Sequence, residues 1–316
     1  MRSQESIHLV AVVPAYKLNE SIFELISNLK QYVEQVIVVD DKCPNGVGRM
    51  VSEKFPGPEV IVVFNKENLG VGGAVKNGYI QALQNGADIV IKIDGDGQMD
   101  PALIPNLISP ILSNRADYTK GNRFYTLDSL KSMPRKRLFG NSILSMFNKF
   151  STGYWNIFDS NNGFTAISRN ALQALDLDRI SNSYFFESDM LFRLYCNRMV
   201  VQDVPMNSFY GNEKSNLSIR RVTLEFLFKH LRNTFKRFFY SYILRDASVA
   251  TIQLPLGLVL FLFGLFNSLT IWLDSSSTGI PNNPGTVMLA GLGILTGLQF
   301  ILAFISYDVS NVPRKN

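Results

Sequence analysis

Histidine and cysteine are nearly missing from this chain of 316 residues. It has two histidines, His8 and His230, and two cysteines, Cys43 and Cys196, which are far apart in the sequence. A Ser-His-Asp hydrolase, a histidine-rich metal centre, a disulfide framework and a thiolate zinc site are therefore disfavoured. No G-x-G-x-x-G follows the first apolar run and no G-x-x-x-x-G-K-[ST] occurs, which disfavours dinucleotide-binding folds and P-loop NTPases. The chemistry must depend on carboxylates, Lys, Arg or a hard cation.

Charged side chains are missing from two long stretches near the C-terminus. Residues 252–273 and 286–307 are stretches of 22 residues without Asp, Glu, Lys or Arg. At about 1.5 Å per residue, a helix of this length spans about 33 Å, enough to cross a hydrocarbon core of roughly 30 Å. We expect two transmembrane helices. The alternative, a pair of buried core helices, is disfavoured because soluble helices of this length usually have a polar face.

The basic residues predict how these helices are oriented. The chain has 31 Lys and Arg against 26 Asp and Glu, and seven of the 31 lie within residues 219–246, just before the first apolar stretch. The loop 274–285 has no Lys or Arg, whereas the tail has Arg314 and Lys315. By the positive-inside rule we expect both termini, and the N-terminal part of the chain with them, in the cytoplasm and the loop outside. We also expect the spans to lie in a cell inner membrane. The charge excess suits phosphates or anionic lipid, and we expect no nucleic acid as a partner.

A basic amphipathic segment precedes the apolar stretches. Between residues 220 and 244, apolar side chains recur at helical spacing with Lys and Arg between them. This pattern predicts interfacial helices on an anionic leaflet, and packing of the same stripe on the soluble domain is the alternative. We therefore expect four regions. They are a catalytic domain over 1–218, juxtamembrane helices over 219–248, a two-span hairpin over 249–310 and a tail over 311–316.

Short β-branched runs alternate with helical stretches in the first hundred residues. The runs are residues 9–13, 36–40, 60–64 and 89–94. Helical patterns lie between them, near 20–32, 47–54 and 71–85. This order predicts an α/β fold with an open, mostly parallel sheet, in which ligands bind beyond the carboxyl ends of the strands. Two of these strand ends are acidic, at Asp40-Asp41 and at Asp94-Gly95-Asp96.

The second acidic strand end is the sharpest chemical signal in the chain. Asp94 and Asp96 are one residue apart in a glycine-rich turn, so both carboxylates can face one cleft. Oxygen ligands at this spacing suit Mg²⁺ or Mn²⁺ shared with a diphosphate. The alternative is a solvated acidic turn. A calcium loop of the EF-hand kind is excluded, because the twelfth position counted from Asp94 is Pro105.

Six motifs together resemble glycosyltransferase family 2, which has the GT-A fold, and within it the polyprenyl-phosphate glycosyltransferases similar to dolichol-phosphate mannose synthase. The motifs are Val12–Tyr16, Val38–Asp41, Asn68–Ala74, Asp94–Gln98, Gly121–Arg123 and Asn162–Phe164. The resemblance covers about residues 8 to 220, and the two following spans are similar to those of bacterial membrane-anchored members. It implies inverting transfer of a hexose from a UDP- or GDP-sugar, with Mg²⁺ or Mn²⁺.

The resemblance gives each matched position a role. Asp94 and Asp96 would bind the metal between the donor phosphates, and Gln98 would lie near the metal or the acceptor. The nucleotide sugar would contact Pro14, Ala15, Tyr16, Glu20, Asp40, Asp41, Asn68, Gly70 and Asp94. The acceptor phosphate would contact Arg123, Arg135, Lys136, Arg137 and Lys214. Three further carboxylates, Asp159, Glu187 and Asp189, would complete the catalytic set on the acceptor side.

The nature of the acceptor stays open at this point. A polyprenyl phosphate such as undecaprenyl or dolichyl phosphate needs no general base, because its second pKa of about 6 leaves it largely dianionic at neutral pH. A sugar hydroxyl on a lipid-linked oligosaccharide would need a carboxylate base, for which Glu187 and Asp189 are the candidates. A non-catalytic membrane scaffold that binds nucleotide sugars is an alternative of another class. The sequence also leaves a homo-oligomer open.

Overall fold

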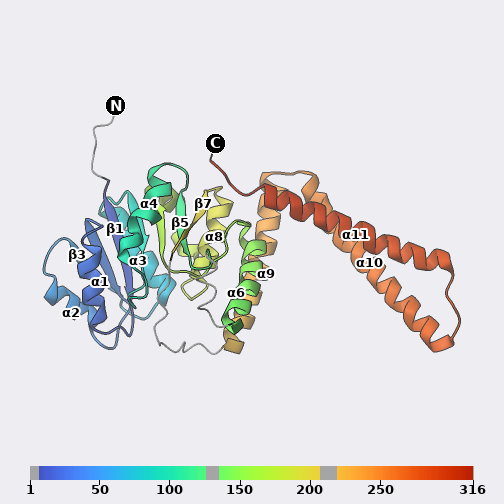
Figure 1. Cartoon of the computed structure of the whole chain (residues 1–316), viewed down its shortest axis with the longest axis horizontal. Coiled ribbons are helices and arrows are strands. Elements are labelled where there is room, and N and C mark those ends of the chain that lie inside the picture. The colour runs from blue at the N-terminus through green and yellow to red at the C-terminus, as the bar shows by residue number, and fades with distance from the viewer. Residues whose placement is uncertain (1–6, 126–134, 207–218, 316) are drawn as a thin grey trace. The chain divides into compact units, whose positions relative to one another are not determined.

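The computed structural model describes residues 7–125, 135–206 and 219–315 (Figure 1). The chain divides into two compact units, Met1–Thr234 with Pro313–Asn316, and Phe235–Val312. In the first unit the strands are β1 (Leu9–Ala15), β2 (Gln35–Asp40), β3 (Val60–Phe64), β4 (Ile89–Lys92), β5 (Tyr118–Asn122), β6 (Thr165–Ser168) and β7 (Val201–Pro205). Its helices are α1 (Ser21–Leu29), α2 (Val47–Lys54), α3 (Val71–Gln84), η1 (Pro101–Leu103), α4 (Ile104–Leu112), α6 (Arg135–Thr152), α7 (Arg169–Gln173), η2 (Leu177–Arg179) and α8 (Phe186–Cys196).

Seven strands form one sheet in the order β3-β2-β1-β4-β6-β5-β7. Strands β1 to β4 run parallel to one another, as the alternation of strand and helix predicted, whereas β6 is antiparallel to both β4 and β5. Strand β7 pairs parallel with β5. The predicted α/β fold with a mostly parallel sheet is therefore confirmed, and the antiparallel strand β6 is what makes the sheet mixed.

Alternate residues of β1 face the two helical layers. Ala11 and Val13 belong to a buried cluster with side chains from α1 and α4. Val12 points to the other face, where α3 approaches so closely that an ideal Cβ at Gly78 would lie 2.3 Å from Val12 Cγ1. Period-two alternation with both faces covered is what a buried parallel strand requires. The helices on either side of the strands are visible in Figure 1.

The register brings the predicted ligand residues to one edge of the sheet. Ala15 at the end of β1 lies opposite Asp40 at the end of β2. Lys92, the last residue of β4, lies opposite Val12, and Asp94 follows two residues later. Parallel strands end on the same edge, so the ends of β1, β2 and β4 form one ligand-facing edge.

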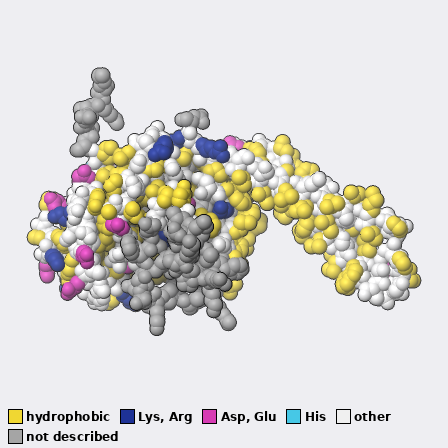
Figure 2. Space-filling view, viewed as in Figure 1, with side chains coloured by type: hydrophobic (Ala, Val, Ile, Leu, Met, Phe, Trp, Pro, Cys, Tyr) yellow, Lys and Arg dark blue, Asp and Glu magenta, His cyan; other side chains and the backbone are white. Residues whose placement is uncertain are grey.

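The second unit consists of the end of α9 (Ile219–Phe238), the π-helix η3 (Phe239–Arg245), α10 (Val249–Thr278) and α11 (Pro284–Ser310). By length and composition, α10 and α11 are both able to cross a membrane. Hydrophobic side chains cover much of their surface in Figure 2. The two predicted apolar helices are therefore confirmed as helices, and each extends a few residues beyond the predicted ends.

Glycines form the seam between α10 and α11. An ideal Cβ at Gly264 would lie 2.5 Å from the backbone nitrogen of Ile294, and one at Gly297 would lie 2.4 Å from that of Phe261. Gly293 also lies directly against Gly264. The sequence G-x-x-x-G at Gly293 and Gly297 thus lets the two backbones approach closely, as small residues do between membrane helices.

A buried ion pair closes the base of this hairpin. Asp308, near the end of α11, is fully buried and accepts from both terminal nitrogens of Arg237, at 2.7 and 2.8 Å. The hydroxyl of Tyr242 in η3 donates to the same carboxylate. This bidentate geometry is the strongest form of an Arg–carboxylate pair.

Helix α9 has one packed face and one exposed face. Within the first unit, His230 stacks on Phe147 of α6 and lies edge-on to Phe185, and burial lowers the pKa of His230 to about 4. The opposite face exposes large apolar side chains. They are Leu224, Phe228, Leu231, Phe235 and, in η3, Phe239. One face of α9 therefore packs within the first unit, and the interfacial role of the exposed side chains stays a prediction.

Candidate active site

The end of β1 supplies the first group of predicted nucleotide residues. Pro14 and Ala15 are its last two residues, and Ala15 is fully buried. Tyr16 follows and is 43% exposed, and Glu20 is an exposed residue at the N-cap of α1. Tyr16 and Glu20 therefore lie at the surface of the ligand-facing edge, and their contact with the nucleotide stays a prediction.

Two loops at this edge are joined and carry strained backbone. The N–H of Lys17 donates to Cys43 Sγ at 3.2 Å, and Asn45 Nδ2 donates to the carbonyl of Leu18 at 2.9 Å. Lys17 and Lys42 both have left-handed backbone, with φ of 54° and 55°. Non-glycine residues held in this region concentrate at functional sites. The joined loops fix the surface beside Tyr16.

Asp40 is engaged by the chain's own backbone. Its carboxylate is buried and accepts the N–H of Cys43 at 2.6 Å on Oδ1 and that of Gly48 at 2.8 Å on Oδ2. Gly48 allows this approach, because an ideal Cβ there would lie 2.4 Å from Asp40 Oδ2. Asp40 therefore holds the turn that begins α2, where a negative charge is favourable at the helix N-terminus.

Asp41 fixes the segment that leads into α3. Its Oδ1 accepts from Asn65 Nδ2 at 2.7 Å and from the N–H of Leu69 at 2.8 Å. Its Oδ2 accepts the N–H of Gly70 at 2.8 Å, and Asn68 Oδ1 accepts the same N–H at 3.0 Å. The predicted nucleotide residues Asn68 and Gly70 are thus positioned by Asp41, which is itself a predicted nucleotide residue.

The glycine run at the start of α3 makes room for a backbone carbonyl. Gly72 and Gly73 donate their N–H groups to the carbonyl oxygen of Asn182, at 2.9 and 3.3 Å. Gly70 has φ of 82°, and an ideal Cβ there would lie 2.7 Å from the same oxygen. Position 70 therefore requires glycine for both its backbone conformation and its close contact.

Asp94 and Asp96 follow β4 at the ligand-facing edge. Asp94 is partly exposed, and Asp96 is exposed and accepts the N–H of Gln98 at 3.1 Å. No group of three or more His, Cys, Asp or Glu that could hold a metal occurs within residues 7–125, 135–206 and 219–315. Mg²⁺ commonly takes one or two carboxylates and completes its shell with phosphates and water. Two carboxylates with oxygen-only chemistry therefore fit a divalent ion shared with a diphosphate.

A buried lysine joins two of the predicted site carboxylates. Lys92 is 1% exposed, and its Nζ lies 2.8 Å from Asp94 Oδ1 and 3.0 Å from Glu187 Oε1. Burial opposes a charge here, but the two carboxylates outweigh it and hold the pKa of Lys92 above its ordinary value. Lys92 was not among the predicted site residues. A single lysine inside the apolar run of β4 is the signal that could have revealed it.

The predicted motif Asn162–Phe164 lies against this pair. An ideal Cβ at Gly163 would lie 2.1 Å from Asp94 Oδ2 and 2.6 Å from Lys92 Nζ. Asp94 and Lys92 therefore occupy the space where a side chain at position 163 would stand. Asp94 is confined by the ammonium group on one oxygen and by the backbone of Gly163 on the other.

Two more buried titratable groups lie on the neighbouring strands β5 and β7. Lys120 Nζ donates to the carbonyl of Asn162, and burial lowers the pKa of Lys120 to about 8. Burial raises the pKa of Asp203 to about 6, against hydrogen bonds that its Oδ2 accepts from the Phe158 N–H at 3.0 Å and Asn122 Nδ2 at 2.8 Å. Burial penalises the charged form of each group, which explains the opposite directions.

Arg123 and Asp159, both predicted on the acceptor side, form a pair. Arg123 Nε lies 2.7 Å from Asp159 Oδ2, and Nη2 lies 2.9 Å from Oδ1. The backbone N–H of Arg123 also donates to Oδ2, at 3.2 Å. The structure therefore brings these two predicted residues together, with Asp159 buried and orienting the guanidinium group.

Glu187 and Asp189 begin helix α8 and have different surroundings. Glu187 contacts Lys92, as described above. Asp189 is buried and accepts the N–H of Ser181 at 2.9 Å and Asn233 Nδ2 at 3.0 Å, so it connects α8 to α9. Glu187 thus lies with Asp94 and Lys92, whereas the contacts of Asp189 are with the surrounding scaffold.

Four predicted phosphate ligands are described in part or not at all. Arg135, Lys136 and Arg137 form the first turn of α6, and their side chains lie outside what the structure describes. Lys214 lies outside the described residues. Their roles stay predictions.

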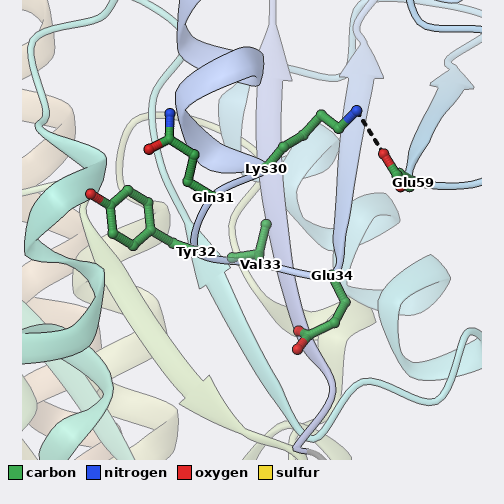
Figure 3. A pocket seen from close by; sticks show the side chains of 6 residues that line it. All are labelled: Lys30, Gln31, Tyr32, Val33, Glu34 and Glu59. Carbon is green, nitrogen blue, oxygen red and sulfur yellow. Dashed lines mark ion pairs between the residues drawn. The ribbon is translucent and has the colours of Figure 1, made fainter.

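A hollow of about 620 Å³ lies at the other end of β2 (Figure 3). Its lining residues include Tyr32, Val33 and Glu34, just before β2 begins, and Lys30 pairs with Glu59 across it at 2.6 Å. The six residues of β2 span about 20 Å at roughly 3.3 Å each, so this hollow is remote from the acidic strand ends. It contains none of the predicted site residues.

Several named proteins are similar to this chain. An enzyme of Methanococcus voltae named UDP-N-acetylglucosamine–dolichyl-phosphate N-acetylglucosaminyltransferase is 29% identical over 213 residues, 63% of this chain and 84% of that protein. An undecaprenyl-phosphate mannosyltransferase of Micrococcus luteus is 29% identical over 191 residues, 59% of this chain and 77% of that protein. A polyprenol monophosphomannose synthase of Mycolicibacterium smegmatis is 26% identical over 202 residues, 62% of this chain and 76% of that protein.

A solved structure and a family model agree with this similarity. Glucosyl-3-phosphoglycerate synthase from Mycobacterium tuberculosis, solved with Mn²⁺, UDP and glucosyl-3-phosphoglycerate, superposes with a TM-score of 0.55 at 16% identity, over 73% of this chain and 80% of that chain. The predicted GT-A fold is confirmed. The model of glycosyl transferase family 2 matches residues 10–176, which is more than half of the chain. The chain therefore belongs to glycosyl transferase family 2 and is a glycosyltransferase.

Proposed function

We propose that this glycosyltransferase moves a hexose from a UDP- or GDP-sugar to a polyprenyl phosphate at a membrane, with inversion at the anomeric carbon. The relatives named for dolichyl, undecaprenyl and polyprenol phosphate support this acceptor class. The single observation that carries the choice of acceptor is the internal engagement of both candidate bases, Glu187 by Lys92 and Asp189 by Ser181 and Asn233. A phosphate acceptor brings its own negative charge and requires neither of them as a base.

The donor diphosphate would lie beyond the ends of β1, β2 and β4. Asp94 and Asp96 would hold Mg²⁺ or Mn²⁺ there, and the ion would offset negative charge on the departing nucleoside diphosphate. Tyr16, Glu20 and the loops fixed by Asp40 and Asp41 would contact the nucleotide. Arg123, oriented by Asp159, would bind the acceptor phosphate, with Gln98 close to the metal or acceptor. The trio Arg135, Lys136 and Arg137, together with Lys214, would add positive charge.

The membrane arrangement is part of the same proposal. The catalytic domain over 1–218 would lie in the cytoplasm, with α10 and α11 as spans in an inner membrane and the 311–316 tail on the cytoplasmic side. The exposed apolar stripe of α9 and η3, with exposed Arg232 and Lys236 beside it, suits an anionic leaflet. This would place the site next to the phosphate of a lipid acceptor.

The acceptor can be tested with labelled donors. Membranes containing the protein would be incubated with UDP-glucose, UDP-N-acetylglucosamine or GDP-mannose, with and without added polyprenyl phosphate, and the lipid fraction analysed. We expect a mild-acid-labile sugar linked to the lipid through one phosphate, because that linkage is what a phosphate nucleophile produces. Label found only in longer glycans would favour a hydroxyl acceptor. Binding of donor without transfer or hydrolysis would favour a non-catalytic scaffold.

A further inference from the structure

Lys92 is a fully enclosed cation whose partners come from two distant parts of the chain. It stands between Ile91 and Ile93, both fully buried, at the end of a central strand. Asp94 lies two residues away and Glu187 lies 95 residues away, on α8. An enclosed ammonium group is stable only when it is paired and hydrogen-bonded on the sides that face the protein. Lys92 therefore fixes the geometry of both carboxylates.

Asp94 differs from its two neighbours in this cluster because it reaches the surface. Its side chain is 32% exposed, against 1% for Lys92 and 10% for Glu187. One oxygen of Asp94 accepts from Lys92, and the other lies against the backbone of Gly163. The carboxylate is thus confined at its buried side and open toward the edge where Asp96 also stands.

Lys92 also balances the negative charge of the carboxylates around it. Asp94, Asp96 and Glu187 are three carboxylates in one region, and a donor diphosphate and an acceptor phosphate would add more negative charge. Without Lys92, the enclosed Glu187 would be an uncompensated charge close to Asp94. With Lys92 present, the Glu187 charge is neutralised inside the protein.

We propose that Lys92 is a positioning residue that holds Asp94 in the orientation needed to bind a divalent cation together with a nucleoside diphosphate, with Glu187 as its counter-charge. The inference rests on the proposed function, because it concerns the same donor site. Residues that orient metal ligands typically change metal affinity or activity by about 10- to 100-fold when they are replaced. Lys92 acts through Asp94 and does not itself reach the ligand, since it is enclosed.

Binding of Mn²⁺ in the presence of UDP provides a test that is independent of catalysis. The full-length protein in detergent would be titrated with Mn²⁺ in the presence of UDP and, separately, of GDP, and free Mn²⁺ would be followed by electron paramagnetic resonance. We expect Lys92→Met to weaken Mn²⁺ binding by about 10- to 100-fold, because Asp94 loses the group that orients it. Lys76→Met is a matched control. Lys76 lies in α3 and donates to the carbonyl of Ile180, so its replacement should leave Mn²⁺ affinity within about twofold.

A double variant separates orientation from charge balance. Lys92→Met leaves Glu187 enclosed without a cation and should lower the thermal midpoint, whereas Lys92→Met with Glu187→Gln removes both charges and should regain stability. If Lys92 orients Asp94, the double variant keeps the defect in Mn²⁺ affinity. Recovery of normal Mn²⁺ affinity in the double variant, or normal affinity in a folded Lys92→Met, would overturn the inference and leave the donor site standing. Failure of the natural chain to bind Mn²⁺ with either UDP or GDP would overturn both.

Discussion

Buried ion pairs occur in both units of this protein, and they differ in one respect. In the first unit, Lys92 is enclosed but its partner Asp94 is 32% exposed at the ligand-facing edge. In the second unit, Arg237 and Asp308 are 3% and 0% exposed, so both members of the pair are enclosed. In the Lys92–Asp94 pair one carboxylate remains partly exposed and can contact a ligand. In the Arg237–Asp308 pair both side chains are enclosed, so the pair can only hold helices together.

The two pairs also differ in what surrounds them. Beside the Asp94 carboxylate the chain has Gly163, where an ideal Cβ would lie 2.1 Å from Oδ2. Around Asp308 it supplies aromatic rings, with Tyr242 and Phe304 packed edge to face at 5.3 Å between centroids. The first environment is open to small polar ligands, and the second excludes them. Substitutions in each unit can test this contrast.

The largest effect is expected at the exposed carboxylates that follow β4. Asp96→Asn should lower transfer activity by about 100-fold or more, because it removes one of the two carboxylates proposed to hold the metal. Activity of purified protein with increasing Mn²⁺ would measure the effect, and EDTA should abolish activity of the natural chain until Mn²⁺ is restored. Asp100→Asn is the control, since Asp100 caps η1 by accepting the N–H of Ala102 at 2.9 Å. Unchanged turnover in Asp96→Asn would contradict the metal assignment.

Breaking the Arg237–Asp308 pair should lower the stability of the protein and leave its transfer activity unchanged. Arg237→Met would leave Asp308 enclosed with the Tyr242 hydroxyl but without its cation, and removing one member of a buried ion pair costs about 3–5 kcal/mol. We expect a lower thermal midpoint for the full chain in detergent, with activity per folded molecule retained. Arg237→Met combined with Asp308→Leu should regain much of the stability, because no charge is then enclosed. A double variant as unstable as the single one would argue against this account.

Filling the glycine seam should be less costly. Gly264→Leu forces α10 and α11 apart, because even a Cβ there would lie 2.5 Å from the Ile294 nitrogen, and overpacking of this kind costs about 1–3 kcal/mol. Gly291→Leu is the control on the same hairpin, since an ideal Cβ at Gly291 meets no heavy atom within 4 Å among the described residues. Thermal midpoints in detergent would compare the two. Equal losses would show that close backbone contact is unimportant for the hairpin.

The smallest effect concerns acid stability of the first unit. Burial lowers the pKa of His230 to about 4 from an ordinary 6.5, so the unfolded chain binds more protons and stability falls as the pH drops below 6.5. Between pH 6 and pH 5 this amounts to about 1 kcal/mol. Replacing the ring with a group that does not titrate, His230→Gln, should flatten this part of the pH profile of the thermal midpoint. An unchanged slope would mean that other groups set the acid sensitivity.

Local patterns account for what could be predicted. The four N-terminal strands, the helices between them and the apolar hairpin were all predicted, because each depends on hydrophobic periodicity within a short window. The order β4-β6-β5-β7 was not, because nothing in the local spacing indicates that β6 lies between two strands that precede it in sequence. Pairing across long separations is a tertiary property.

The candidate site shows the same division. The acidic strand ends were predicted from sequence, and the register places them on one edge. That Asp40 and Asp41 orient backbone N–H groups was not predicted, because those partners depend on the exact path of two loops. The Lys92–Glu187 contact joins residues 95 positions apart, and the Arg237–Asp308 contact joins residues 71 apart, beyond any local pattern.

Gly163 limits how this enzyme can be redesigned. A methyl group at that position would occupy the space of Asp94 Oδ2, so alanine there would displace that carboxylate even if the glycine itself contacts no ligand. Alanine scanning would therefore score Gly163 as if it were a substrate contact. Libraries intended to change the sugar or lipid that the enzyme accepts should keep this position fixed and place their diversity on exposed residues such as Tyr16.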